Sequence, residues 1–482
     1  MSMAYQEHPV YKHFEAISRI PHGSGQEKAL SDYIMFFAKN LKLPAVQDDL
    51  GNLVIRKPAA KGYENAPVVM LQGHLDMVCE KNMDIAHNFE REPLKLVVEG
   101  DWLRADGTTL GADDGVAVAY CMALMGDDTL AHPALEVVLT VDEEVGLVGA
   151  TALDAGLVNG DILINLDSGE EGVFLTSCAG GLKLDMDVPV TREAAFAGDA
   201  GICIRVTGLQ GGHSGIDIDK GRGNSIRIMA ALLEQLRTAF GARLASFEGG
   251  LKDNAIPREA AAVVCVPQEK LAGVLAVVAA YAAEIKPVYA TADPLLAVEA
   301  AETAANGDVL TDESAQTLLT FLLELPNGPL AYSAAFATLV ETSNNVGVVR
   351  LSADKAQVVC ALRSSVAASK HTLSSEIHAL AEKVNAQVAA HGEYPAWEYN
   401  PDSRIRELAV ETYEAMTGQE AVLEAVHAGL ECGLFAAKRP GLDMIALGPT
   451  MHDIHSPLER LSLSSFIRTW DLLVEILRKV NA

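Results

Sequence analysis

The sequence predicts an α/β protein, in which a mixed, mostly parallel sheet is sandwiched by helices and carries an inserted α+β domain. Three observations lead to this fold class. Strand-like and helix-like runs alternate over residues 1–185, strands and helices mix less regularly over 186–395, and the alternation resumes over 396–482. Such alternation is typical of a parallel sheet with helices on both faces. A chain of 482 residues is also longer than one hydrophobic core usually serves, so more than one domain is expected.

The first part of the chain contains apolar runs that predict buried strands, over residues 66–78, 134–141 and 161–166. A helix is expected over 115–127, because the run is apolar, long and free of proline. Another helix is expected over 29–41, where Ser24 and Glu27 form an S-x-x-E capping signal before it.

The middle of the chain has a different pattern. Residues 224–240 predict a long amphipathic helix, and the polar break inside residues 348–366 predicts a hairpin. The alternation of strand and helix signals seen over residues 1–185 returns over residues 396–482. We therefore expect a discontinuous domain, residues 1–185 and 396–482, into which a second domain, residues 186–395, is inserted.

Composition excludes several classes of protein. The chain has 65 acidic and 37 basic residues and a net charge of -28, which disfavours nucleic acid as a partner. The N-terminus has no signal-peptide pattern, and no run of about 18 apolar residues predicts a membrane span. Seven dispersed cysteines without a CxxC pair favour reduced thiols. A cytoplasmic protein with no membrane partner is expected.

Short clusters of acids and histidines follow the apolar runs. They comprise His74, Asp76, Asp113, Glu143, Glu144, Asp167 and His455. Open α/β sheets bind ligands at the carboxyl ends of their strands, so these side chains are expected to meet. Carboxylates and imidazoles without thiolate suit hydrolytic zinc, manganese or cobalt rather than structural zinc. The set is large enough for two metal ions that share one carboxylate.

Each cluster alone has an ordinary explanation. An H-x-D pattern is common, Asp113 could be a helix cap, and adjacent acids such as Glu143 and Glu144 normally mark a solvated turn. His452 lies near His455 and could be the ligand in its place. In a metal site, however, one acid of the pair can bind the ion while the other acts as a general base on bound water.

Taken together, the motifs resemble those of the co-catalytic zinc peptidases of the aminoacylase and carboxypeptidase type, and among them the aminoacyl-histidine dipeptidases. The resemblance runs along nearly the whole chain, through GHLDMV, RADGTTLGADDG, EEVGLVGA, DILINLDSGEEG, GLQGGHSG, DNAIPREA, HAGLECGLF and GPTMHDIHSP. It implies that His74, Asp113 and Asp167 hold one metal ion. The second ion would be held by Asp113, Glu144 and His455.

The resemblance also implies an activity, which is metal-dependent hydrolysis of dipeptides, preferentially Xaa-His dipeptides such as the carnosine-like β-Ala-His. Glu143 would act as general base on a metal-bridged water, and Asp76 would orient His74. The implied cofactors are two divalent ions, Zn²⁺ with Co²⁺ or Mn²⁺ as substitutes. The implied partners are a small dipeptide and, because related enzymes look dimeric, a second copy of the chain.

The inserted domain is expected to be a lid that also serves dimerisation. By resemblance, His213 in GGHSG would polarise the scissile carbonyl, while Asn254 and Arg363 would hold the substrate. Arginine suits a substrate carboxylate because it donates two parallel hydrogen bonds. Gly429 could present its backbone N–H to the substrate terminus.

Two other functions stay open at this point. A broader di- or tripeptidase, or an N-acyl amino acid deacylase, would use the same metals and differ only in its lid contacts. A binding protein that has lost catalysis is the non-enzymatic alternative. The intact acid pair, Glu143 and Glu144, disfavours it.

Overall fold

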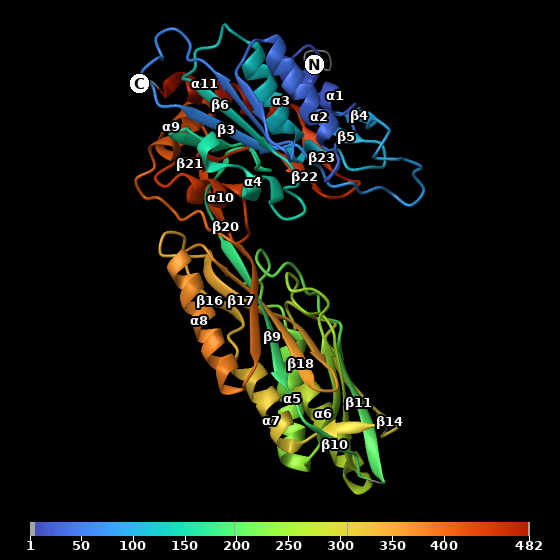
Figure 1. Ribbon diagram of the computed structural model, residues 1–482. Coiled ribbons are helices and arrows are strands. Elements are labelled where there is room, and N and C mark those ends of the chain that lie inside the picture. The colour runs from blue at the N-terminus through green and yellow to red at the C-terminus, as the bar shows by residue number, and fades with distance from the viewer. Residues whose placement is uncertain (1–4, 197, 306, 481–482) are drawn as a thin grey trace. The chain divides into compact units, whose positions relative to one another are not determined.

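The computed structural model describes residues 5–196, 198–305 and 307–480, and their contacts divide the chain into two units (Figure 1). Unit 1 comprises the chain up to Cys178, Tyr399–Ala425 and the chain from Leu430 onward. Unit 2 comprises Ala179–Glu398 and the short return segment Val426–Gly429. The boundaries predicted from sequence, after residues 185 and 395, lie a few residues from those of the two units, and the return segment was not predicted.

Unit 1 combines a main sheet, a smaller sheet and several helices. Its helices are α1 (Pro9–Ile17), α2 (Lys28–Asn40), α3 (Ala112–Gly126), α4 (Val148–Ala152), α9 (Arg404–Thr417), α10 (Glu431–Lys438) and α11 (Leu463–Lys479), with the 3-10 turn η1 (Ala155–Leu157). Its strands are β1 (Ala45–Gln47), β2 (Leu53–Lys57), β3 (Val69–His74), β4 (Leu96–Glu99), β5 (Trp102–Ala105), β6 (Leu135–Thr140), β7 (Ile162–Asn165), β8 (Val173–Cys178), β20 (Val422–Val426, which ends in the return segment), β21 (Asp443–Ala446), β22 (Met451–His452) and β23 (Arg460–Ser462).

The main sheet is mixed, with parallel strands at its centre. Its strand order is β1-β2-β6-β3-β7-β21-β8-β20. β3 pairs in parallel with both β6 and β7, and β21 pairs in parallel with β7. β2 pairs in antiparallel fashion with β1 and β6, and β8 pairs in the same fashion with β21. The carboxyl ends of β3, β6 and β7 therefore lie at one edge of the sheet, which confirms the predicted fold class.

The alternation of side chains along β3 separates the hydrophobic core from the polar site. Val69 and Leu71 lie in the main core with residues of α1, α3 and α11. Gly73 continues this face, and an added Cβ would collide with Ala117 of α3. Gln72 and His74 point to the opposite face, since successive strand residues alternate. The start of α10 bonds to Gln72 on this second face, so helices lie on both faces of the sheet, as predicted.

The helix predicted over 29–41 is present as α2, but the prediction that Ser24 and Glu27 cap it is wrong. α2 begins at Lys28, and Glu27 at its N-cap makes no side-chain capping bond. The Ser24 hydroxyl instead donates to Asp76 over 2.8 Å, and Glu27 accepts the N–H of Asp142 over 3.0 Å. Tertiary partners have replaced the local capping bonds.

Unit 2 is an α+β structure. Its helices are α5 (Ser225–Phe240), α6 (Leu271–Ile285), α7 (Asp312–Glu324) and α8 (Ala367–Lys383), with the 3-10 turn η2 (Gln268–Lys270). Its strands are β9 (Gly180–Pro189), β10 (Arg192–Ala194), β11 (Asp199–Thr207), β12 (Arg243–Gly249), β13 (Ala260–Pro267), β14 (Ala297–Thr303), β15 (Asp308–Leu310), β16 (Gly328–Tyr332), β17 (Val340–Leu351), β18 (Lys355–Ser364) and β19 (Gln387–Tyr394).

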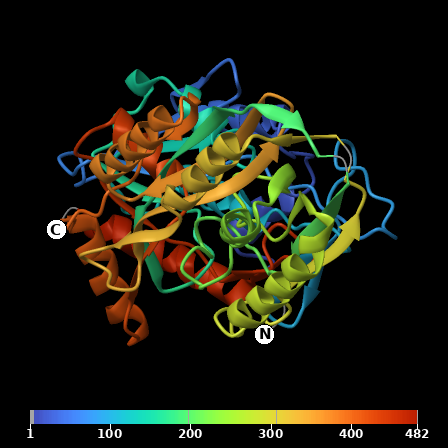
Figure 2. The ribbon, with the colours of Figure 1, turned by 90° about the horizontal axis from the view of Figure 1, so that it is seen from below.

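The large sheet of unit 2 is antiparallel and has the order β14-β11-β13-β12-β17-β18-β9-β19. Its inward-facing residues form one core with α5, α6, α7 and α8, whose ribbons can be followed in Figure 2. The predicted hairpin is confirmed, since β17 and β18 pair across a turn at Ser352–Asp354. The long helix expected over 224–240 is confirmed as α5.

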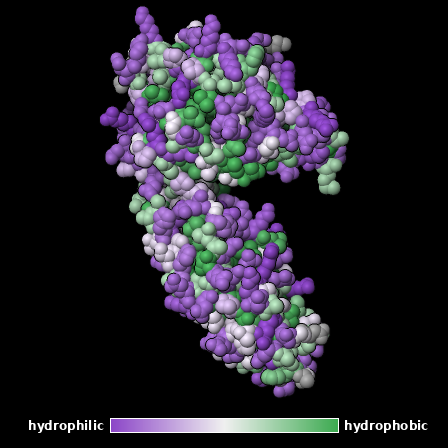
Figure 3. Space-filling view, in the orientation of Figure 1, coloured by the Kyte–Doolittle hydropathy of each residue, from purple (hydrophilic) through white to green (hydrophobic). Residues whose placement is uncertain are grey.

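The surface is largely polar. The face seen in Figure 3 is mostly hydrophilic, with hydrophobic residues scattered over it. In the part of the chain that the structure describes, no helix is long and apolar enough to cross a membrane.

Candidate metal centre

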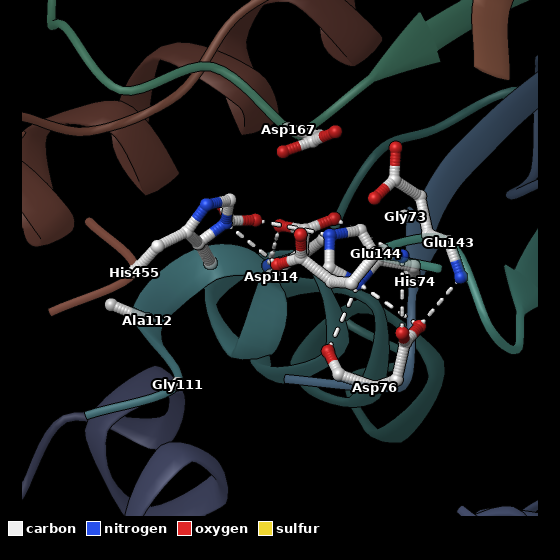
Figure 4. A network of polar contacts seen from close by, with 12 residues as sticks. Gly73, His74, Asp76, Gly111, Ala112, Asp114, Glu143, Glu144, Asp167 and His455 are labelled. Carbon is white, nitrogen blue, oxygen red and sulfur yellow. Dashed lines mark hydrogen bonds and ion pairs between the residues drawn. The ribbon is translucent and has the colours of Figure 1, made fainter. Parts of the chain in front are cut away.

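The polar clusters of unit 1 meet at the carboxyl edge of the main sheet (Figure 4). His74 is the last residue of β3, Glu143 and Glu144 follow β6, and Asp167 follows β7. Because these strands are parallel neighbours, their ends bring the side chains to one place. His455 reaches the same place from the loop after β22.

Asp113 lies between the two histidines. Its Oδ1 is 3.0 Å from Nε2 of His74, and its Oδ2 is 3.2 Å from Nε2 of His455. Nε2 of His455 is also 2.8 Å from Oε1 of Glu144. One carboxylate thus faces two imidazoles with its two oxygens, which is the arrangement that a ligand shared by two ions requires.

Among the described residues, three groups of ligand atoms lie close enough to hold a metal ion, and two of them include His74. One group is His74, Asp113 and Glu144, the other is His74, Asp114 and Asp167, and in each the atoms lie within 4.8 Å of one another. Asp114 was not predicted. Its carboxylate is fully buried and accepts the N–H of His74 over 3.2 Å and that of Ala117 over 3.3 Å. These bonds give Asp114 a role in fixing the start of α3.

The electrostatics of this place favour a cation. Burial, and then the charges of Asp113 and Asp114, raise the pKa of Asp167 well above its ordinary value. Burial also raises the pKa of Glu143 to about 7. Burial opposes the charged form of His74, but its contacts with Asp113 and Asp76 hold its pKa well above the usual range. Buried like charges disfavour one another's ionisation, and a cation relieves this.

The donor set therefore fits divalent metal ions. It offers imidazole nitrogens and carboxylate oxygens and no thiolate, which suits zinc, cobalt or manganese. Glu143 and Asp167 make no ion pair with lysine or arginine within residues 5–196, 198–305 and 307–480. The excess of carboxylates over protein cations is the observation on which this fit rests.

Asp76 holds the Glu143–Glu144 turn rather than the imidazole alone. Its Oδ1 accepts the N–H of Glu143 over 3.0 Å, and its Oδ2 accepts the N–H of Glu144 over 3.2 Å. The hydroxyl of Ser24 donates to Oδ2 over 2.8 Å. Nδ1 of His74 is closer to the backbone carbonyl of Asp76, 3.0 Å away, than to its carboxylate, 3.5 Å away. The backbone carbonyl of Asp76 therefore contacts the imidazole, and its carboxylate fixes the acid pair.

A second buried acid lies beneath the strand ends. Glu431, at the start of α10, is 1% exposed and accepts hydrogen bonds from Gln72 and, over 2.7 Å, from Thr140. Burial, and then the charge of Glu143, raise the pKa of Glu431 to about 8. The bonds tie the ends of β3 and β6 together, and Glu431 was not among the residues predicted for the site.

His452 is unsuited to replace His455 as a ligand. It lies on β22, and its ring packs at 5.1 Å from the ring of Trp102. His455, in contrast, has its Nε2 among the carboxylates, and burial only partly opposes the contacts with Asp113 and Glu144 that raise its pKa to about 10.

Unit 2 carries a polar cluster of its own. Arg363 is 8% exposed, donates from Nη1 to the hydroxyl of Tyr394 over 2.7 Å, and has Nη2 at 3.4 Å from Nε2 of His213. Its Nε is buried and has no hydrogen-bond partner among the residues that the structure describes. Nε2 of His427 lies 2.7 Å from the hydroxyl of Ser343. Burial, and then Arg363, lower the pKa values of His213 and of His427, the latter to about 3.

The tautomer of His213 follows from its backbone contacts. Its Nδ1 accepts the N–H groups of Gly215 over 3.2 Å and Ile216 over 3.1 Å, so the proton of the neutral ring lies on Nε2. The ring can therefore donate a hydrogen bond from the nitrogen that is next to Arg363.

Asn254 and Gly429 are the other residues predicted in this part of the chain. The backbone carbonyl of Asn254 accepts the N–H of Ser214 over 2.9 Å, beside His213, and its side chain is exposed. Gly429 approaches the ring of Tyr394, because a Cβ added there would lie 2.7 Å from a ring carbon. Tyr394 and His427 were not predicted; a tyrosine near the end of a strand gives no signal in sequence alone.

Comparisons with known proteins cover nearly the whole chain. Residues 70–479 match peptidase family M20/M25/M40. The chain is 37% identical over 474 residues to the cytosol non-specific dipeptidase of Escherichia coli K12, which spans 98% of each chain. Aminoacylhistidine dipeptidase from Vibrio alginolyticus has a similar structure, with a TM-score of 0.92, 36% identity and coverage of 99% of this chain and 98% of that one. Aminopeptidase PepT from Bacillus cereus shares the fold, with a TM-score of 0.57, 17% identity and 98% coverage of both chains.

The repulsion among the buried carboxylates leads to a prediction for the variant Asp167→Asn. In the presence of a chelator at neutral pH, the free energy of unfolding of the variant is expected to be about 1 kcal/mol higher than that of the original protein, because the cost of ionising or protonating a buried acid among like charges is gone. With Zn²⁺ added the order should reverse, since a ligand is lost. Urea unfolding of both forms measures this, with exposed Asp49→Asn as the control. Equal stabilisation of both proteins by Zn²⁺ would contradict the assignment of Asp167.

Proposed function

Because the chain belongs to peptidase family M20/M25/M40, we propose that it is a metal-dependent dipeptidase whose metal centre lies at the carboxyl edge of the main sheet of unit 1. The observation that carries this proposal is the position of Asp113, whose two carboxylate oxygens face His74 and His455 at 3.0 and 3.2 Å. The likeness to dipeptidases of Escherichia coli and Vibrio alginolyticus supports it.

Two divalent ions would be held by five side chains. His74, Asp113 and Asp167 would hold one ion, and Asp113, Glu144 and His455 the other. When bound, such ions act as Lewis acids and lower the pKa of water towards neutrality. Zn²⁺ is the proposed ion, with Co²⁺ or Mn²⁺ as substitutes, because imidazole and carboxylate donors accept all three.

Glu143 is the proposed general base. Its pKa of about 7, raised by burial, is close to that of a base that must both accept and return a proton near neutral pH. It would take a proton from the attacking water and deliver it to the leaving amine. Asp76 positions this carboxylate through the backbone N–H of Glu143, and so keeps it beside the ligand Glu144.

Arg363 is the proposed site for the carboxylate of the substrate. A nearly buried guanidinium whose Nε has no partner in the described part of the chain is suited to a carboxylate, which can accept two parallel hydrogen bonds from it. His213, neutral and protonated on Nε2, would donate to the scissile carbonyl and stabilise the developing oxyanion. Asn254 and the N–H of Gly429 are proposed as further substrate contacts.

The proposed substrates are dipeptides, preferentially Xaa-His, with β-Ala-His among them. The Vibrio alginolyticus relative, an aminoacylhistidine dipeptidase, supports this preference, whereas the name of the Escherichia coli relative, a non-specific dipeptidase, supports a broader range. A tripeptidase or an N-acyl amino acid deacylase on this scaffold is the alternative. The cytoplasmic location and the homodimer stay predictions.

A substrate panel with restored metal tests the proposed reaction. Chelated protein is expected to be inactive and to regain hydrolysis with Zn²⁺, Co²⁺ or Mn²⁺. Xaa-His dipeptides and β-Ala-His should be cleaved with higher kcat/KM than other dipeptides, tripeptides and N-acetyl amino acids. Hydrolysis of N-acetyl amino acids alone would replace the proposed function with that of a deacylase.

Replacing the base should separate catalysis from metal binding. Glu143→Gln keeps the size of the side chain but cannot accept the proton, so kcat should fall about 10²–10⁴-fold. Elemental analysis should show unchanged metal content, because Glu143 is not a proposed ligand. Glu170→Gln, at an exposed acid near Asp167, is the control and should retain the original kcat. Near-normal turnover in Glu143→Gln would rule out this base.

The carboxylate site can be tested with paired substrates. Arg363→Gln should lower kcat/KM for a dipeptide about 10–100-fold, which corresponds to the loss of charge-assisted hydrogen bonds of about 1.5–3 kcal/mol. The same variant should change kcat/KM for the dipeptide amide little, because the amide lacks the carboxylate. Arg350→Gln, at an exposed arginine of β17, is the control. An equal loss of kcat/KM for both substrates would show that Arg363 does not bind the carboxylate of the substrate.

A further inference from the structure

Four consecutive backbone N–H groups before and at the start of α3 converge on one side chain. Oε2 of Glu459 accepts the N–H groups of Leu110 over 2.7 Å and Gly111 over 3.1 Å. Oε1 accepts those of Ala112 over 2.8 Å and Asp113 over 3.4 Å. The turn curls around the carboxylate because Gly111 adopts a left-handed conformation, with φ of 68°.

This carboxylate is buried among backbone dipoles rather than paired with a cation. Glu459 is 2% exposed, and within the residues that the structure describes it makes no ion pair with lysine, arginine or histidine. A buried carboxylate is costly unless its oxygens are satisfied, and several N–H groups can satisfy them. The burial of the Glu459 carboxylate thus depends on the N–H groups of this turn, and the conformation of the turn depends on the carboxylate.

The turn and the loop that supplies Glu459 each carry a proposed metal ligand. Asp113 is the last residue of the turn, and His455 lies four positions before Glu459 in the same loop. Oδ2 of Asp113 and Nε2 of His455 are 3.2 Å apart. The loop therefore reaches the turn at two points, through the ligand His455 and through the carboxylate of Glu459.

We propose that Glu459 is a positioning residue for the metal centre, which sets the place of the shared carboxylate of Asp113 relative to His455. This rests on the proposed metal centre but not on the identity of the substrate. Without the carboxylate, the four N–H groups lose their common acceptor, and Asp113 is no longer fixed by its own backbone. Residues that orient metal ligands in this indirect way commonly change metal affinity about 10–100-fold when they are replaced.

Unit 1 offers a matched control in Glu136, a buried acid with the same kind of bonds at the other end of β6. It is 1% exposed, and its Oε1 accepts the N–H groups of Asn159 over 2.7 Å and Gly160 over 3.2 Å. Its Oε2 accepts a hydrogen bond from Arg56 over 3.0 Å. Glu136→Gln should therefore lower the Tm without a change in metal affinity.

The test measures metal binding to the chelated full-length chain, by competition of Zn²⁺ and Co²⁺ with a chromophoric chelator. Glu459→Gln is expected to weaken Zn²⁺ binding about 10–100-fold, because its amide group turns an N–H donor towards N–H donors. The visible absorption of the Co²⁺ form should change as well, since it reports ligand geometry. In Glu136→Gln both readouts should match the original protein.

Wild-type Zn²⁺ affinity and an unchanged Co²⁺ spectrum in Glu459→Gln, with only the Tm lowered, would overturn the proposal. If Glu459→Gln fails to fold, Glu459→Asp takes its place, since it keeps the charge and withdraws it by one methylene. Weakened Zn²⁺ binding in Glu459→Asp supports the proposal, and wild-type binding overturns it. Dipeptide hydrolysis is not a readout here, so a wrong substrate assignment would leave these results intact.

Discussion

The accumulation of carboxylates at the carboxyl edge of the main sheet is the constraint around which unit 1 is built. Asp113, Asp114 and Asp167 are brought together by the start of a helix and the end of a strand, in a place where burial makes each charge costly. Two histidines offset only part of this charge. A protein keeps such an arrangement where a cation completes it, and the surrounding hydrogen bonds serve to hold the acids in place despite their repulsion.

Those hydrogen bonds come from a layer of buried polar residues behind the proposed ligands. Asp76 binds the backbone of the Glu143–Glu144 turn, Glu431 ties β3 to β6, and Glu459 gathers the turn before α3. Each is an acid that acts through N–H, hydroxyl or amide donors. The proposed ligands are thus placed by backbone segments that are themselves fixed, which gives the site more rigidity than side-chain rotamers alone would provide.

The fold class, the family and the convergence of the predicted ligands could be inferred from sequence, because apolar runs followed by acids mark strand ends. The supporting layer could not. Glu459 and Glu431 read as ordinary loop and helix acids, since nothing local shows which backbone groups they will meet. The signal at Ser24 and Glu27 was misleading for the same reason, because its hydroxyl and carboxylate are used by Asp76 and Asp142 instead of a helix end. Asp114 was overlooked beside Asp113.

The return segment Val426–Gly429 has a consequence for how this architecture can be rearranged. Unit 2 is not one continuous insertion. His427, which contacts Ser343, comes from a short segment that both precedes and follows unit 1 residues in the sequence. Transplanting residues 179–398 alone into another scaffold would leave this histidine behind. Recombination between relatives would therefore succeed more readily when the donor contributes both stretches, so the two pieces are expected to be inherited together.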